Sequence, residues 1–170
     1  TNYIKRPKMA NITQLILVVS IKLPKPDMLL LDKQLVYAEF MKIKPIICLN
    51  KIDLDSANVA SEIENTYSEI GYTVIKTDAK NGIGVDKIKQ YLKNNITAFS
   101  GNSGVGKSTL LNSLLGENIS EEGVISKKNK RGKNTTTQVR LHKIEENSYV
   151  ADTPGFSTFE VREIEKNDLA

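Results

Sequence analysis

Cysteine and histidine are almost absent from this sequence, and their scarcity limits the metal chemistry of the chain. Its 170 residues contain one cysteine, Cys48, and one histidine, His142. A zinc cluster of three cysteines and a histidine therefore cannot form within this chain. Cys48 lies in an apolar segment, so we expect it to be a small core residue. We expect His142 to be a surface residue of a strand rather than a ligand.

Long apolar runs and targeting segments are also missing. No apolar run reaches the roughly 20 residues that a membrane-spanning helix needs, and no segment has the pattern of a secretory signal peptide. We therefore expect a protein without membrane attachment that works in the reducing cytoplasm. No internal repeat or long linker divides the chain, and 170 residues suffice for a buried core. Residues 1–170 are interpreted as one domain.

Apolar segments of strand length alternate with helical segments along most of the chain. Strands are predicted at 14–20, 45–49, 72–76, 96–99, 139–142 and 149–151. Helices are predicted at 28–42, 56–70, 85–93 and 109–115. This alternation is typical of an α/β fold in which helices cover both faces of a mostly parallel sheet. Together with the phosphate-binding motif described next, it predicts the three-layer sandwich of a P-loop NTPase.

A phosphate-binding loop lies between the predicted strand at 96–99 and the predicted helix at 109–115. It reads Gly101-Asn102-Ser103-Gly104-Val105-Gly106-Lys107-Ser108 and is followed by Thr109. Its glycines let successive backbone N–H groups approach phosphate oxygens, and the start of the helix favours negative charge. Lys107 is predicted to contact the β and γ phosphates and to be catalytic, and Ser108 to bind Mg²⁺. A glycine-rich turn that matches by chance is the alternative, and the flanking strand and helix disfavour it.

A guanine-recognition motif follows the predicted strand at 45–49. It consists of Asn50-Lys51-Ile52-Asp53. The Asp53 carboxylate can accept hydrogen bonds from the N1–H and exocyclic amine of guanine, which adenine cannot offer. Lys51 is expected to lie over the base, and Asn50 to tie this loop to the phosphate loop. A helix-capping turn is the alternative interpretation.

A second guanine-binding segment is predicted after the strand at 72–76. It reads Thr77-Asp78-Ala79-Lys80 and fits the fifth sequence element of GTPases. The backbone N–H of Ala79 is expected to meet guanine O6, and Lys80 completes the element. Asp78 stands where Ser is usual, so this segment is the weaker of the two guanine signals.

Three further residues are expected to face the γ phosphate or the magnesium ion. Asp152, in the string Asp152-Thr153-Pro154-Gly155, would hold Mg²⁺ through a water, and the Gly155 N–H would face the γ phosphate. A simple turn is the alternative, and the position of the string after the phosphate loop favours the magnesium role. Thr136 is chosen as the catalytic, Mg²⁺-binding threonine of switch I. A threonine run that merely begins the next strand is the alternative.

The segment 123–138 is rich in Lys, Gly, Asn and Thr and lacks hydrophobic periodicity, so we expect a mobile loop. Its basic stretch at 127–133 has two interpretations, an RNA contact or a solvated loop. The net charge of +4 and the pI near 9.0 are compatible with an RNA partner without requiring one.

The guanine motif precedes the phosphate loop, which is the reverse of the usual order and indicates a circularly permuted GTPase domain. This order, the string from Gly101 to Asn112, the segment 132–137 and the string from Asp152 to Phe156 resemble the RsgA-type ribosome small-subunit-dependent GTPases. The resemblance extends from residue 6 to residue 156. It implies GTP/GDP and Mg²⁺ as ligands, hydrolysis of GTP to GDP and phosphate, and a role with the small (30S) subunit and its rRNA in late maturation.

In that family an OB-fold precedes the GTPase domain and a zinc-binding domain follows it. Neither flank is found in this chain, so we expect an excised or partly ordered GTPase core, with zinc confined to the family's C-terminal domain. We separately expect the chain to be a monomer.

Two departures from familiar GTPases concern the attacking water. Asn134 stands where the family usually has His, and Phe156 stands where small GTPases have a water-orienting Gln. Asn134 leaves the residue that positions the water unassigned, and Phe156 implies slow intrinsic hydrolysis. A GTP-binding switch or scaffold is therefore one alternative function. Another is a permuted GTPase of large-subunit assembly. Gly104, where those proteins have Asn, and the string Ser20-Ile21-Lys22, where they have Asp-Ala-Arg, argue against it.

Overall fold

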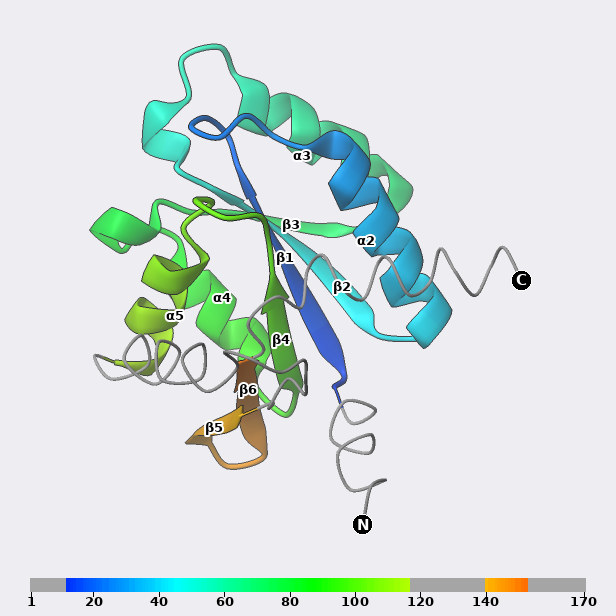
Figure 1. The fold of residues 1–170 in the computed structure, drawn as a ribbon, viewed down its shortest axis with the longest axis vertical. Coiled ribbons are helices and arrows are strands. Elements are labelled where there is room, and N and C mark those ends of the chain that lie inside the picture. Colours follow the sequence, from blue (N-terminus) through cyan, green and yellow to red (C-terminus); the bar gives the residue numbers. More distant parts are fainter. Residues whose placement is uncertain (1–11, 117–139, 153–170) are drawn as a thin grey trace, which may run out of the picture.

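The computed structural model describes residues 12–116 and 140–152, which contain one six-stranded sheet (Figure 1). The strands are β1 (Gln14–Ser20), β2 (Lys44–Asn50), β3 (Thr73–Lys76), β4 (Ile96–Ser100), β5 (Arg140–Glu145) and β6 (Ser148–Asp152). Their order across the sheet is β3-β2-β1-β4-β6-β5. All neighbours are parallel except β5 and β6, which are antiparallel. The mostly parallel sheet that the sequence predicts is therefore confirmed.

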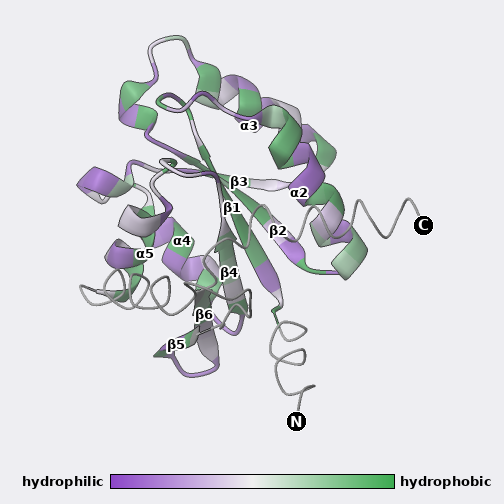
Figure 2. Ribbon diagram, viewed as in Figure 1, coloured by the Kyte–Doolittle hydropathy of each residue, from purple (hydrophilic) through white to green (hydrophobic). Residues whose placement is uncertain are grey.

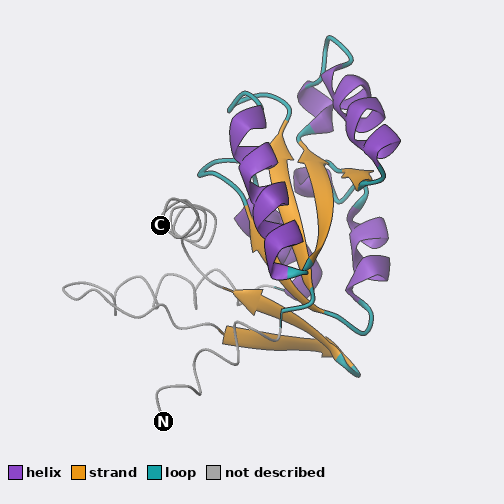
Figure 3. Cartoon of the chain, turned by 90° about the vertical axis from the view of Figure 1, so that its right-hand side faces the viewer, coloured by secondary structure: helices purple, strands orange, loops and turns teal. Residues whose placement is uncertain are grey.

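Helices cover both faces of the sheet, as predicted (Figure 3). They are α2 (Met28–Met41), α3 (Val59–Ile70), α4 (Val85–Leu92) and α5 (Lys107–Leu115), with the short 3-10 helices η2 (Ile52–Leu54) and η3 (Ala79–Asn81). The buried residues of α2 and α3 pack on one face, and those of α4 and α5 on the other. The described part of the chain thus forms the three layers of the sandwich.

Alternate residues of the central strands supply the two apolar cores. Leu17 and Leu49 face α2 and α3, where they join one cluster with Leu35 and Ile63. Their strand neighbours Val18 and Cys48 belong to the second cluster, which includes Ile88 of α4 and Leu110 of α5. The ribbon of these strands is mostly hydrophobic in Figure 2. Burial of each large aliphatic side chain stabilises the fold by about 1.5–3 kcal/mol.

Two observed helices begin at different residues from those predicted. The helix predicted from residue 56 begins at Val59, because Asn58 adopts a left-handed φ of 58° and the Asp55 carboxylate accepts hydrogen bonds from the first N–H groups of α3. The helix predicted from residue 109 already begins at Lys107, directly after the left-handed Gly106. In both cases backbone and capping geometry determine the first residue.

Because β1, β2, β3, β4 and β6 are parallel, their ends gather at two opposite edges of the sheet. The carboxyl edge carries Asn50 and the phosphate loop. The amino edge carries the connection from α4 to β4, which joins the two ends of an ordinary GTPase in this permuted order.

A mesh of hydrogen bonds covers the amino edge. Asn95 accepts from the Thr13 hydroxyl through Oδ1 (2.9 Å) and donates to the Tyr91 carbonyl through Nδ2 (3.1 Å). Ser148 Oγ accepts from the Asn94 N–H (2.8 Å). Gln14, fully buried, donates to the Tyr91 carbonyl (2.9 Å) and to Thr97 Oγ1 (3.0 Å). These bonds hold the α4–β4 connection against β1 and β6.

The expectations for Cys48 and His142 can be compared with the structure. Cys48 is fully buried in β2, as predicted, and burial raises the pKa of its thiol to about 12. His142 lies in β5 and is half-buried. Within residues 12–116 and 140–152, no helix has the length and apolar character required to cross a membrane.

Candidate functional site

The phosphate loop connects β4 to α5 at the carboxyl edge of the sheet. Gly104 and Gly106 have φ values of 85° and 97°, in the left-handed region that favours glycine. A Cβ added to Gly101 would lie 2.7 Å from the Val18 carbonyl oxygen, and one added to Gly106 would overlap the Asn50 amide. The loop therefore fits against β1 and against the guanine motif only with glycine at these positions.

The polar residues of the loop lie near the start of α5. Ser103, Ser108 and Thr109 are exposed, and Lys107 is half-buried as the first residue of the helix. Val105 is buried and packs into the core with Leu110. Asn102 Nδ2 donates to Asp27 Oδ2 over 3.5 Å, beside the start of α2. Val105 thus anchors the loop in the core, while the polar side chains of the loop stay near solvent.

Asn50 connects three segments at the end of β2. Its Nδ2 donates to the Val105 carbonyl (2.9 Å), which confirms the predicted tie between the guanine motif and the phosphate loop. Its Oδ1 accepts from Thr77 Oγ1 (2.9 Å) and from the Ala79 N–H (3.0 Å). Asn50 is 2% exposed, so these bonds are shielded from water. Both predicted guanine segments and the phosphate loop therefore meet at one buried amide.

Lys51 also bridges loops. It adopts a left-handed φ of 65°, and its Nζ donates to the Gly104 carbonyl (2.7 Å) and to the Leu23 carbonyl (2.5 Å). The second bond reaches the connection between β1 and α2, which sequence reasoning did not include. A backbone carbonyl carries no sequence signal for such a contact. The participation of Thr77 was also missed, although its place between β3 and Ala79 could have suggested it.

The other predicted guanine residues surround this junction. Asp53 lies in η2 and is exposed. The Ile52 N–H donates to the Thr77 carbonyl (3.2 Å), which holds η2 beside the end of β3. Ala79 is buried and its N–H donates to Asn50, so its expected bond to guanine O6 stays a prediction. Lys80, in η3, is exposed.

The predicted magnesium and γ-phosphate residues are covered only in part. Asp152 is the last residue of β6, which runs parallel to β4, so the chain leaves this strand at the edge that carries the phosphate loop. Thr136 and Gly155 lie outside the described residues. Within the part that is described, no three His, Cys, Asp or Glu side chains are grouped as a metal cluster.

These features define a class. A glycine-rich loop between a parallel strand and a helix, joined through Asn50 to a guanine motif that comes earlier in the chain, is the arrangement of a circularly permuted P-loop GTPase domain.

Comparison with known proteins identifies the family. The profile of the RsgA GTPase family matches residues 1–162, and the chain belongs to that family. The small ribosomal subunit biogenesis GTPase RsgA of Ruminiclostridium cellulolyticum is 46% identical over 164 residues, which cover 96% of this chain and 53% of the relative. The chain thus spans about half the length of the curated relatives it matches.

Two solved structures resemble the fold. YjeQ from Thermotoga maritima superposes with a TM-score of 0.66 at 35% identity, covering 86% of this chain and 49% of that one. YloQ, described as a circularly permuted GTPase, superposes with a TM-score of 0.64 at 31% identity, covering 90% of this chain and 48% of that one. The permuted α/β architecture is therefore shared with both.

Proposed function

We propose that this chain is the GTP-hydrolysing core of a factor that matures the small ribosomal subunit. It binds GTP and releases GDP and phosphate. Membership of the RsgA GTPase family supports the activity, and the names of the relatives support the ribosomal role. The proposal depends mainly on the Asn50 junction, by which we mean the buried hydrogen bonds of Asn50 with Val105, Thr77 and Ala79. These bonds join the guanine motif to the phosphate loop.

The phosphates of GTP would lie on the loop from Gly101 to Ser108 and at the start of α5, with Thr109 beside them. The left-handed Gly104 and Gly106 permit the tight backbone curve that turns N–H groups toward an anion. In this proposal Lys107 stabilises the charge that develops on the transferred phosphoryl group, and the Gly155 N–H faces the γ phosphate.

Ser108, Thr136 and, through a water, Asp152 would hold Mg²⁺. The hydroxyl and carboxylate oxygens of these residues suit a hard cation, and Ser108 is exposed at the start of α5. When bound, the ion would neutralise charge on the β and γ phosphates.

The base would lie beside η2 and η3. The exposed Asp53 carboxylate would accept from guanine N1–H and N2–H, and the backbone of Ala79 would approach O6, flanked by Ile52 and Lys80. The Lys51 stem would lie along the base while its ammonium group stays on the Gly104 carbonyl. An adenine nucleotide would leave the Asp53 carboxylate without donors, which favours guanine.

A GTP-binding switch with negligible hydrolysis is the second candidate. It is favoured by Asn134 and Phe156, since neither residue is the one that orients water in better-known GTPases. Single-turnover hydrolysis with and without 30S subunits separates the two. Phosphate release that rises when subunits are added supports the enzyme, whereas binding without turnover in either condition supports the switch.

The partner would be the rRNA of the small subunit, contacted through the basic stretch at 127–133, and the protein would act as a cytoplasmic monomer. Because RNA binding that rests on Lys and Arg weakens steeply with salt, co-sedimentation with 30S subunits should fall as the salt concentration rises. Salt-independent co-sedimentation would argue against this contact. Sedimentation of the free chain tests the monomer.

Base specificity tests the guanine site directly. Asp53→Asn should weaken GTP binding and improve binding of xanthosine triphosphate, whose O2 accepts a hydrogen bond where guanine donates one. Calorimetric titration measures both affinities. Asp86→Asn, which removes an exposed carboxylate from α4, is the matched control. An unchanged GTP affinity in Asp53→Asn would rule out this role.

A further inference from the structure

A closed loop follows β3 and carries η3. The backbones of Asp78 and Ile83 exchange two hydrogen bonds, from the Asp78 N–H (2.9 Å) and from the Ile83 N–H (3.0 Å). Gly84 then leaves the loop with a φ of 81°, and a Cβ at this position would overlap the Lys76 carbonyl oxygen. The loop is thus fixed at both ends, so its conformation depends on what holds its middle.

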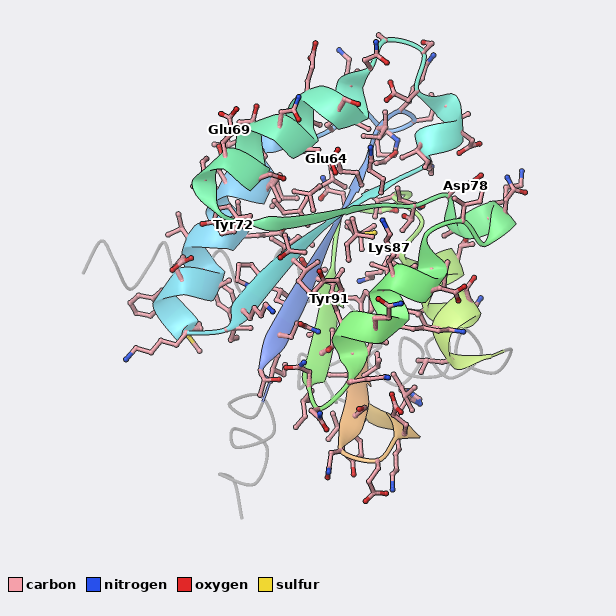
Figure 4. The ribbon with its side chains drawn as sticks, turned by 180° about the vertical axis from the view of Figure 1, so that it is seen from behind. Glu64, Glu69, Tyr72, Asp78, Lys87 and Tyr91 are labelled. Atoms are coloured by element: carbon pink, nitrogen blue, oxygen red, sulfur yellow. The ribbon has the colours of Figure 1, made fainter. Side chains whose placement is uncertain are left out.

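The Asp78 side chain holds the middle. It is 2% exposed, and its carboxylate accepts from the Asn81 side-chain Nδ2 (2.7 Å) and the Asn81 N–H (3.3 Å). A buried carboxylate is unfavourable unless its oxygens are hydrogen-bonded. Both of these donors belong to one residue three positions along the chain. Asp78 therefore fastens η3 onto the end of β3, at the opposite end of that strand from Tyr72 (Figure 4).

The inner side of this loop contacts the Asn50 junction. Thr77 and Ala79, the two neighbours of Asp78, both donate to Asn50 Oδ1. Because Oδ1 receives both donors, Nδ2 of the same amide faces the Val105 carbonyl in the phosphate loop. A displacement of Asp78 would therefore be transmitted through its neighbours to Asn50.

We propose that Asp78 is a positioning residue for base recognition. By fastening η3, it holds the Ala79 backbone and the Asn50 amide in the geometry that a guanine base meets. The proposal rests on the proposed guanine-nucleotide function and extends it to a residue that does not itself contact the ligand. It also gives a reason for an aspartate at a position where Ser is usual, since two acceptor oxygens match the two donors of Asn81.

The test is discrimination between GDP and ADP, measured by displacement of a fluorescent GDP analogue. Asp78→Ala removes the carboxylate that accepts from Asn81 Nδ2, while the Asn81 N–H keeps its bond to the Asp78 carbonyl (3.2 Å), and we expect GDP affinity to fall about tenfold. ADP affinity should change less than about twofold, because the phosphate loop keeps its own contacts. Asp78→Asn retains an acceptor for Asn81 and should recover GDP affinity to within about threefold of the original chain.

A purely structural role is separated by a matched control. Ser148 is buried at the amino edge of the sheet, and Ser148→Ala removes the acceptor of the 2.8 Å hydrogen bond from the Asn94 N–H. This variant should lower stability without changing the ratio of GDP affinity to ADP affinity. If Asp78→Ala fails to fold, Asn81→Ala replaces it. Asn81 is exposed, and Asn81→Ala removes the side-chain Nδ2 donor to the same carboxylate.

Each outcome has one meaning. The positioning role is supported if the ratio of GDP affinity to ADP affinity falls in Asp78→Ala or Asn81→Ala and does not fall in Ser148→Ala. An original chain that shows no preference for GDP overturns the proposed function itself. A chain that prefers GDP, together with variants that keep the preference, overturns only the role of Asp78.

Discussion

The two edges of the sheet use hydrogen bonds in different ways. At the amino edge, hydrogen bonds that involve Thr13, Gln14, Asn95 and Ser148 are spread over several strands, and most of them join a side chain to a nearby backbone group. At the carboxyl edge, two loops are hydrogen-bonded to the single amide of Asn50: the phosphate loop through Val105, and the segment after β3 through Thr77 and Ala79. If one residue of the amino-edge network is replaced, the other hydrogen bonds still hold the chain. If Asn50 is replaced, all the hydrogen bonds that join these loops to its side chain are lost. The first pattern stabilises the fold, and the second connects the loops of the proposed nucleotide site.

The largest expected effect is at Gly106. In Gly106→Ala the added methyl group would overlap the Asn50 amide, and the backbone φ of 97° at this position is itself unfavourable for alanine. We expect GTP affinity to fall about a thousandfold, which corresponds to ~4 kcal/mol. Gly71→Ala is the control at the amino edge, since its φ of 108° is equally left-handed but no atom lies within 4 Å of the added Cβ.

Gly71→Ala should show only the strain of the left-handed backbone, about 1–2 kcal/mol of unfolding free energy. Chemical denaturation and calorimetric titration of both variants check this. Equal GTP affinities would mean that the close approach of Gly106 to Asn50 is unimportant.

The next largest effect is expected at Asn50, a buried amide at the carboxyl edge, and Gln14 is the buried amide at the amino edge with which it is compared. Asn50→Ala and Gln14→Ala each leave buried groups unpaired, so both should lower the free energy of unfolding by about 1–3 kcal/mol. Only Asn50→Ala should also weaken GTP binding, by about a hundredfold. Loss of affinity in Gln14→Ala as well would show that the amino-edge mesh is not independent of the site.

A smaller effect is expected at Lys51. Lys51→Met keeps the stem but removes the bonds to the Leu23 and Gly104 carbonyls, and should weaken GDP binding about tenfold. Lys44→Met is its control at the amino edge, where the ammonium lies 5.6 Å from the centre of the Tyr91 ring. Titration with GDP should find no change in that variant. A tenfold loss in both would point to a general effect of net charge.

The smallest effect concerns acid stability. The Ala60 N–H, followed by those of Val59, Ala57 and Asn58, lowers the pKa of Asp55 below its ordinary 3.8, against a raising contribution from desolvation. A depressed folded-state pKa adds stability that is present above pH 3.8 and is lost as pH falls through the folded value. Asp55→Asn should therefore flatten the acid limb of a stability profile measured by urea denaturation. An unchanged slope would contradict this.

Most of the fold could be predicted because its signals are local. The strand Gln14–Ser20 was predicted with the bounds that the structure has, since the sequence contains the uninterrupted apolar run at 15–19, and all seven residues of the strand are buried. The strand predicted to end at His142 continues to Glu145, because it pairs with β6 in a hairpin across the turn at 146–147, which the sequence prediction did not include. The link from Lys51 to Leu23 was likewise beyond prediction, since any residue can supply a backbone carbonyl.

The buried thiol of Cys48 can report how readily the structure around it opens. Its sulfur is fully buried, 3.3 Å from Thr77 Oγ1, and the thiol with its raised pKa stays protonated and unreactive at neutral pH. A thiol reagent can modify it only when the residues packed over it, which include Ala79 of η3 and Ile88 of α4, move away. Since this is the only cysteine, the rate of modification reports how readily this part of the protein opens, without any engineered label, and a bound guanine nucleotide should slow it.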